Sequence, residues 1–224
     1  MVNYAVDPAI LRPLTPAGTE LDVWRGTSYI SLVGFLFLRT RVLGLPIPFH
    51  SNFEEVNLRF YVRRRDGREW KRGVAFVKEM VPRYAIAAVA RRLYHENYVS
   101  VPMRHKIAEG RSTPPSVEYL WQSGCRWNRV HVKTAGEWQP LEAGSEAEFI
   151  AEHYWGYSAQ PDGGCVEYRV EHPSWNVCGV SETVVDCDVS AVYGPEFEAA
   201  MRAKPASAFL AEGSAIIVHS GRRI

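Results

Sequence analysis

The sequence predicts an α+β, mainly β protein: a curled antiparallel sheet with a few helices inserted as connections. Strand-like segments recur along the whole chain, helical patterns are short and few, and no regular alternation of strand and helix indicates a parallel sheet. Aromatic residues make up 12% of the chain, which favours strands and lined cavities over a helical bundle. The 224 residues can bury a core of their own, so we expect one domain over residues 1–224.

The first elements follow from a helix cap and from apolar runs. Asp7 before Pro8 is an N-cap followed by proline at the first helical position, which predicts a short helix over residues 8–14. Two strands should follow, over residues 19–24 and 27–39.

Residues 53–63 form the most regular strand pattern in the chain. Apolar residues at the even positions should share one face of this strand, and the odd positions the other. The polar face consists of Glu55, Asn57, Arg59 and Tyr61. We expect this face to line a polar pocket inside the curled sheet, and a solvent-exposed sheet face is the alternative.

A tight hairpin is predicted after this strand. Asp66-Gly67 suits a two-residue turn, and the return strand should end before Pro82. The pairs that this turn implies are Glu55 with Lys78, Asn57 with Phe76, and Arg59 with Val74. A carboxylate beside Lys78 would raise the pKa of that amine, so a structural ion pair is favoured over a nucleophilic lysine.

The remaining segments alternate between short helices and strands. Residues 83–96 carry an apolar stripe at helical spacing. Ser145 and Glu148 form a capping box for a third helix, which should run into Tyr154, and a fourth is expected over residues 195–202. Strands are expected over residues 98–107, 116–122, 126–134, 166–171, 182–192, 206–212 and 215–220.

Composition argues against several classes of partner. The 26 basic and 25 acidic residues give a net charge of +1, so no nucleic-acid surface is indicated. No apolar stretch is long enough to span a membrane, and no signal-peptide pattern opens the chain. The 4 cysteines show no CxxC spacing, so we expect reduced thiols and a cytoplasmic location. Homo-oligomerisation stays open.

Five segments carry a resemblance to a known family. They read FEEVNLRFYV at residues 53–62, RGVAF at 72–76, ARRLYHENY at 90–98, EHYWGY at 152–157 and VEHPSW at 170–175. By these segments the chain is identified as a member of the YqjF-like family of uncharacterised bacterial proteins, whose fold is similar to that of acetoacetate decarboxylase. The resemblance implies a sheet rolled into a cone-like barrel with an internal cavity.

Acetoacetate decarboxylase works through a Schiff base, which a buried lysine with a depressed pKa forms with the ketone. The resemblance implies that Tyr98 stands at the position of this lysine, and a tyrosine cannot form an imine. It implies that the active-site glutamate of the decarboxylase is retained as Glu55. The carboxylate-binding arginine is expected to fall before the first residue of this chain. The resemblance therefore implies the decarboxylase fold without its Schiff-base chemistry.

Two further groups of residues are candidates for chemistry. Tyr94, Glu96 and Tyr98 follow the predicted helix directly, where the decarboxylase keeps its chemistry. Glu96 could be a general acid or base if it is buried, and a polar helix terminus is the alternative. His153 and His172 each follow a glutamate, but their segments lie far apart in the sequence. Packing in the core beside the nearby tryptophans is favoured over a metal site.

Together, these observations predict a small-molecule-binding barrel for a polar or carboxylated organic ligand. Its predicted ligand-binding residues are Glu55, Asn57, Arg59, Tyr61, Tyr94 and Tyr98. One alternative is an enzyme that acts on a small organic acid by acid–base catalysis, with Glu55, Glu96 or Lys78 as catalytic candidates. A protein-interaction domain is the other alternative. No cofactor and no metal ion is expected, and the identity of the ligand stays open.

Overall fold

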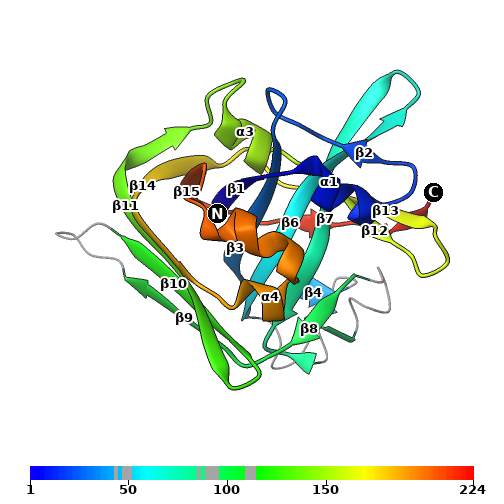
Figure 1. Cartoon of the computed structure of the whole chain (residues 1–224). Helices are drawn as coiled ribbons and strands as arrows, with labels where there is room; N and C mark the ends of the chain where they lie inside the picture. The colour runs from blue at the N-terminus through cyan, green and yellow to red at the C-terminus, as the bar shows by residue number, and fades with distance from the viewer. Residues whose placement is uncertain (43–44, 47–51, 85–86, 89–95, 109–114) are drawn as a thin grey trace.

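The computed structural model describes residues 1–42, 45–46, 52–84, 87–88, 96–108 and 115–224 of the chain (Figure 1). One sheet of 15 strands dominates this part. Its strands are β1 (Val2–Val6), β2 (Glu20–Leu21), β3 (Ser28–Phe37), β6 (Phe53–Asp66), β7 (Glu69–Val81), β8 (Tyr98–Ser100), β9 (Met103–Ala108), β10 (Ser116–Ser123), β11 (Arg126–Pro140), β12 (Trp155–Ala159), β13 (Cys165–Glu171), β14 (Asn176–Asp186), β15 (Ser207–Ala211), β16 (Ile217–Val218) and β17 (Arg222–Arg223). A separate two-stranded pair consists of β4 (Arg41–Val42) and β5 (Leu45–Pro46).

The helices between these strands are short. They are α1 (Pro8–Leu11), α3 (Glu146–Ala151), α4 (Val189–Val192) and α5 (Glu198–Arg202), with 3-10 turns at Arg12–Leu14 and Pro195–Phe197. No helix in the described part of the chain is long and apolar enough to cross a membrane. The predicted class, mainly β with a curled antiparallel sheet and few helices, is confirmed.

The strand order explains how the sheet curls. It runs β16-β13-β12-β7-β6-β3-β1-β15-β14-β11-β10-β9, and its two ends do not pair with each other in the described residues. Neighbouring strands along this path are antiparallel, except that β7 and β12 are parallel. Outside this path, β8 also pairs with β7 in parallel. Figure 1 shows β10, β11 and β14 on one side of the molecule and β6 and β7 on the other, with α4 between them.

The main core fills the inside of this curl. It combines side chains from β1, β3, β6, β10 and β11 with side chains from α4 and α5. Its members include Tyr4, Phe60, Trp121, Val132 and Phe197, all at most 6% exposed. Because strands from both halves of the path contribute to one cluster, burial of this apolar surface holds the sheet in its curled form.

The alternation predicted for β6 is confirmed. Val56, Leu58, Phe60 and Val62 all point into the main core. The partners of β6 across β3 follow without interruption from Ile30 opposite Phe60 to Phe37 opposite Phe53. The odd-numbered residues of β6 therefore share the opposite face of the sheet.

The predicted register of the β6–β7 hairpin is wrong. Asp66 pairs with Glu69, so the turn consists of Gly67 and Arg68, and Gly67 takes the positive φ of 62° that suits glycine. Further along, Arg59 pairs with Phe76 but Leu58 pairs with Lys78. Val77 is the extra residue of a β-bulge, which reverses the alternation of β7 beyond it. The residue opposite Asn57 is therefore Glu79.

The bulge also removes Lys78 from the polar face. Lys78 lies opposite Leu58, on the main-core side, and its Nζ donates a hydrogen bond to the backbone carbonyl of Val192 at the end of α4. The expected ion pair of Lys78 with Glu55 is thus wrong. A cation at the C-terminal end of a helix is favourable, so this contact ties α4 to the sheet.

Replacing Lys78→Met should cost about 1 kcal/mol of unfolding free energy, because the Val192 carbonyl loses its charged donor while the aliphatic part of the side chain stays. Urea denaturation at neutral pH measures this loss. Borohydride treatment with acetoacetate should leave both proteins without an adduct at residue 78. An adduct found only in the unsubstituted protein would contradict the structural role of Lys78.

Other differences from the sequence expectation are local. The strand expected over residues 182–192 ends at Asp186, because Asp188 accepts a hydrogen bond from Ala191 N and starts α4. β12 was not expected, and it follows the predicted helix α3 directly. The helix expected over residues 83–96 falls largely outside the described residues.

Candidate functional site

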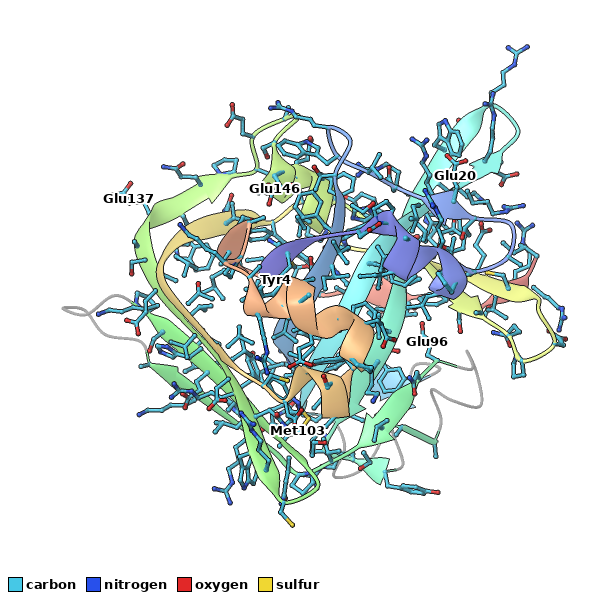
Figure 2. The ribbon with its side chains drawn as sticks, in the orientation of Figure 1. Tyr4, Glu20, Glu96, Met103, Glu137 and Glu146 are labelled. Atoms are coloured by element: carbon cyan, nitrogen blue, oxygen red, sulfur yellow. The ribbon has the colours of Figure 1, made fainter. Side chains whose placement is uncertain are left out.

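The polar face of β6 is buried except at the half-buried Arg59, although it lies on the opposite side of the sheet from the main core. Glu55 and Asn57 are each 2% exposed, and Tyr61 is 1% exposed. This position differs from the expected one inside the curl, because apolar side chains and the helices α4 and α5 already fill that space. In Figure 2, Tyr4 of the main core lies within the curl, whereas Glu96 lies beyond β7, next to β8.

Three buried glutamates meet on this face, and we call Glu55, Glu79 and Glu96 the carboxyl cluster. Glu79 of β7 pairs with Asn57 of β6 on one side and with Tyr98 of β8 on the other. Glu96 precedes β8 by two residues and shares a hydrogen bond with Glu79. The β-bulge at Val77 is what brings a glutamate, rather than Lys78, into this position.

Neutral donors surround the carboxyl cluster. Asn57 Nδ2 donates to Glu55 Oε1 at 2.8 Å, and the Tyr98 hydroxyl donates to Glu55 Oε2 at 3.1 Å. The hydroxyl of Tyr168, from β13, donates to Glu96. Glu55 and Tyr98, both predicted to bind the ligand, are therefore in direct contact in the structure.

Burial dominates the ionisation of this cluster. It raises the pKa of Glu55 and of Glu96 from 4.5 to about 7. For Glu79, burial and then the neighbouring carboxylates of Glu96 and Glu55 raise the pKa well above the usual value. Burial also raises the pKa of Tyr98 and Tyr168, so both hydroxyls keep their protons. At neutral pH the cluster therefore retains protons, which its members share through hydrogen bonds.

The other end of the polar face carries positive charge. Arg59 Nη2 donates to the carbonyl of Ile150 at 3.0 Å, near the end of α3. The guanidinium group of Arg59 also lies 5.7 Å from the centre of the Tyr61 ring. Tyr61 itself is fixed, because its hydroxyl shares a 2.5 Å hydrogen bond with Ser31. Tyr61 therefore offers its ring, rather than its hydroxyl, to this part of the face.

His153 completes this end of the face. Its ring packs 4.7 Å from the ring of Tyr61 and 5.6 Å from that of Phe149. Burial, followed by the nearby Arg72 and Arg59, lowers the pKa of His153 well below its usual value, so the imidazole is neutral. The expectation that His153 packs in a core is confirmed, with Tyr61 and Phe149 as its ring partners.

His172 belongs to a different place in the fold. Its ring stacks on Trp175 at 4.1 Å and on Tyr154 at 4.8 Å. The expected packing beside Trp175 is confirmed, but His172 is only half-buried, so this contact lies outside the core. The described residues contain no group of three or more His, Cys, Asp or Glu side chains that could hold a metal ion.

Several buried polar atoms of this face have no hydrogen-bond partner among the described residues. They are Asn57 Oδ1, Arg59 Nε, Glu79 Oε2, and Nδ1 and Nε2 of His153. Strand geometry places the atoms of Glu79, Asn57 and Arg59 next to one another, since Glu79 lies opposite Asn57 and Arg59 follows Asn57 on the same face. His153 lies close enough to Arg59 for its pKa to be affected by that charge. A buried polar atom without a partner costs about 1–3 kcal/mol, and native proteins contain few of them. This group of atoms is therefore suited to binding a polar molecule.

Two site residues escaped sequence reasoning. Glu79 is not predicted from the sequence, because alternation without a bulge directs Lys78, rather than Glu79, toward Glu55. Tyr168 lies 72 positions from Glu96, and no local pattern indicates that β13 reaches this face. Tyr94, expected among the ligand-binding residues, lies outside the described residues.

Comparison with known proteins agrees with the resemblance seen in the sequence. The model of the DUF2071 family, described as an uncharacterized conserved protein, matches residues 1–215. The chain is similar to the uncharacterized protein YqjF of Bacillus subtilis (strain 168), at 28% identity over 154 residues. That match covers 68% of this chain, which spans 59% of the length of its relative.

Solved structures with a similar fold include an acetoacetate decarboxylase, a decarboxylase-like enzyme and a biosynthetic enzyme. Acetoacetate decarboxylase from Legionella pneumophila aligns with a TM-score of 0.63 and 11% identity, over 100% of this chain and 82% of its own. An acetoacetate decarboxylase-like enzyme from Sphingomonas wittichii RW1 aligns with a TM-score of 0.62 and 13% identity, over 100% and 88%. The enduracididine biosynthesis enzyme MppR, complexed with the condensation product of pyruvate and imidazole 4-carboxaldehyde, aligns with a TM-score of 0.63 and 13% identity, over 99% and 85%. The expected acetoacetate-decarboxylase-like fold is confirmed.

Proposed function

Because the chain belongs to the DUF2071 family and has an acetoacetate-decarboxylase-like fold, we propose that it binds a small polar organic molecule on the buried face of β6 and β7. The observation that carries this proposal is the group of unpartnered polar atoms of Glu79, Asn57, Arg59 and His153. A ligand with hydrogen-bonding groups at both ends would satisfy these atoms. Because these polar atoms are buried, a molecule that failed to pair with them would bind poorly, and binding would therefore be specific.

The place of this face in the fold supports the proposal. Tyr98, at the position that the resemblance assigns to the Schiff-base lysine, donates to Glu55, the glutamate that the resemblance carries over. MppR, which shares the fold, is complexed with a product of pyruvate and an aldehyde, so this architecture can hold small organic molecules. Lys78, the nearest lysine in the sequence to this face, is engaged with α4. The proposed ligand is therefore held without an imine.

Acid–base catalysis on the same ligand is the second candidate. It is favoured by the pKa of Glu55 and of Glu96, which burial brings to about 7. A carboxyl group that titrates near the working pH exchanges protons with a substrate most effectively. Tyr98 hydrogen-bonds both Glu55 and Glu79. Glu79 in turn hydrogen-bonds Glu96, so a proton taken up at Glu55 could be redistributed toward Glu96.

Thermal unfolding with a panel of small acids, amines, amino acids, keto acids and polyols tests the proposal. A ligand should raise the melting temperature of the wild type by several degrees at saturating concentration. In Tyr98→Phe, which keeps the ring and removes only the hydroxyl that donates to Glu55, the affinity for that ligand should fall about tenfold. Glu182→Gln, an exposed change on β14, is the matched control.

The outcomes separate the candidates. If wild type and Tyr98→Phe bind the same ligand with equal affinity, the ligand binds at another place in the protein. A ligand that is consumed on long incubation by the wild type, but not by Glu55→Gln, would favour the enzyme. If no compound of the panel stabilises the protein at pH 6 or pH 8, the binding function itself is contradicted.

A further inference from the structure

We infer that the ligand of this face is a small zwitterion, with an ammonium group at the carboxyl cluster and a carboxylate at Arg59 and His153. The inference rests on the proposed function and names the chemical class of its ligand. Each end of the face has donors or acceptors without a partner, and the two ends differ in charge. These two properties indicate which ligand group each end can bind.

The carboxyl cluster needs donors. Its unpartnered atoms, Asn57 Oδ1 and Glu79 Oε2, are both acceptors, and both residues are at least 98% buried. The hydroxyls of Tyr98 and Tyr168 already donate to Glu55 and Glu96. An incoming group must therefore bring its own N–H or O–H bonds. An ammonium group supplies three donors, and ionisation of one of the three carboxyl groups balances its charge, whereas a ligand carboxylate brings neither a donor nor a charge that these groups can balance.

The opposite end needs an acceptor. Arg59 uses Nη2 on Ile150, but its Nε is an unpartnered donor. His153 is neutral, so one of its two ring nitrogens carries a hydrogen; the backbone of Ile150 lies close to this ring, but neither nitrogen makes a hydrogen bond of normal geometry. Arg72 adds positive charge beside His153, although it is paired with Asp22 at 2.7 Å. A ligand carboxylate fits this end by charge and by hydrogen bonding.

The distance between the ends limits the size of the ligand. Glu55 and Arg59 are four positions apart on one extended strand, so their Cα atoms are separated by about 13 Å. Their side chains shorten this gap, since Arg59 is close enough to act on the charge of Glu55. An amino acid whose chain has about three to five carbon atoms, counting the carboxylate carbon, matches what remains.

Binding should release a proton. The titratable groups that face this site from the described elements are Glu55 and Arg59 on β6, Glu79 and Arg72 on β7, Glu96 and Tyr98 around β8, Tyr168 on β13, His153 after α3 and, beside Arg59, the buried amine of Met1. Without a ligand, the glutamates share protons at neutral pH. When R–NH₃⁺ binds, one carboxyl group ionises to balance its charge, and the displaced proton passes to solvent while the ligand keeps its own.

Isothermal titration calorimetry with 3-aminopropanoate, 4-aminobutanoate and 5-aminopentanoate tests the inference. Butanoate lacks the amine, butylamine lacks the carboxylate, and succinate exchanges the amine for a second carboxylate. At least one amino acid of the series should bind about tenfold or more tightly than these analogues. Titrations at pH 7 in phosphate and in Tris, whose ionisation enthalpies differ, should report release of about one proton per ligand.

A matched pair of variants locates the amine. Glu79→Gln should weaken binding of the amino acid about tenfold and reduce the proton release, because the cluster loses an ionisable group next to Asn57. Glu182→Gln should change neither value. Equal effects of Glu79→Gln on the amino acid and on butanoate would contradict an ammonium at the cluster.

Failure of this inference can be told apart from failure of the proposed function. Tighter binding of succinate than of every amino acid, or binding with proton uptake, would overturn the zwitterion and leave a polar ligand at this face. The zwitterion would also be overturned, and the proposed function kept, if no amino acid of the series binds while other compounds of the thermal-unfolding panel bind with an affinity that depends on Tyr98. If neither the series nor the panel binds, both proposals fall.

Discussion

Raising the pH from 5 to 8 is expected to destabilise the wild type by about 2–3 kcal/mol relative to Glu55→Gln. The cause is the buried carboxyl group of Glu55, whose pKa rises from 4.5 in the unfolded chain to about 7 in the folded protein. A raised pKa means that the folded state holds the proton more tightly. This contribution is complete below pH 4.5 and is lost as the pH rises through 7. The amide of the Glu55→Gln variant does not titrate, so the stability of that variant lacks this contribution.

Urea denaturation of both proteins at pH 5, 6, 7 and 8 measures the difference. The comparison with a variant is needed because burial lowers the pKa of His153 and of the Met1 amine, which titrate in the opposite sense over part of this range. The contributions of these two groups to the pH dependence are the same in wild type and variant, so they cancel in the difference between the two unfolding free energies. Glu182→Gln, exposed on β14, should follow the wild type at every pH. If the difference in unfolding free energy between wild type and Glu55→Gln does not change with pH over this range, Glu55 is ionised in the folded protein and the expectation is wrong.

Gly156→Ala is expected to destabilise the protein by about 3 kcal/mol and to abolish ligand binding. Gly156 of β12 pairs with Tyr168 of β13, and a Cβ at residue 156 would lie 2.0 Å from Cζ and 2.3 Å from the hydroxyl oxygen of Tyr168. The ring must therefore move, and its hydroxyl then loses Glu96. Overpacking and a broken buried hydrogen bond both contribute.

Two variants make this result specific. Gly179→Ala is the control, since its Cβ would approach only the carbonyl oxygen of Ala135, at 3.3 Å, and should cost less than about 1 kcal/mol. Adding Tyr168→Leu to Gly156→Ala should recover part of the stability, because the smaller side chain leaves room for the methyl group, without recovering binding. Full binding by Gly156→Ala would mean that Tyr168 has no part in the site.

Local sequence determined much of the architecture. Strict alternation placed the even-numbered residues of β6 in the core and left Glu55, Asn57, Arg59 and Tyr61 together on the other face. The capping box at Ser145 correctly started α3, where Ser145 Oγ accepts from Glu148 N at 3.1 Å. Such features depend on neighbours within a few residues. The resemblance implied that Glu55 and Tyr98 belong to one site, and these residues, 43 positions apart, are hydrogen-bonded in the structure.

The chemistry of the site depended on contacts that no local pattern records. A single bulged residue, Val77, exchanges a lysine for Glu79 on the polar face and so turns an expected ion pair into a proton-sharing cluster. The side of the sheet on which this face lies was likewise set by packing, because α4 and α5 filled the curl with apolar side chains.

The amino-acid sequence alone therefore specified which side chains of β6 would lie on the same face, since side-chain direction in a strand depends only on alternation. It did not specify their neighbours. A bulge shifts every later pairing by one residue, and the approach of Tyr168 to Glu96 depends on how distant strands stack. Both are set by the free energy of the whole packed sheet, to which residues far apart in the chain contribute jointly.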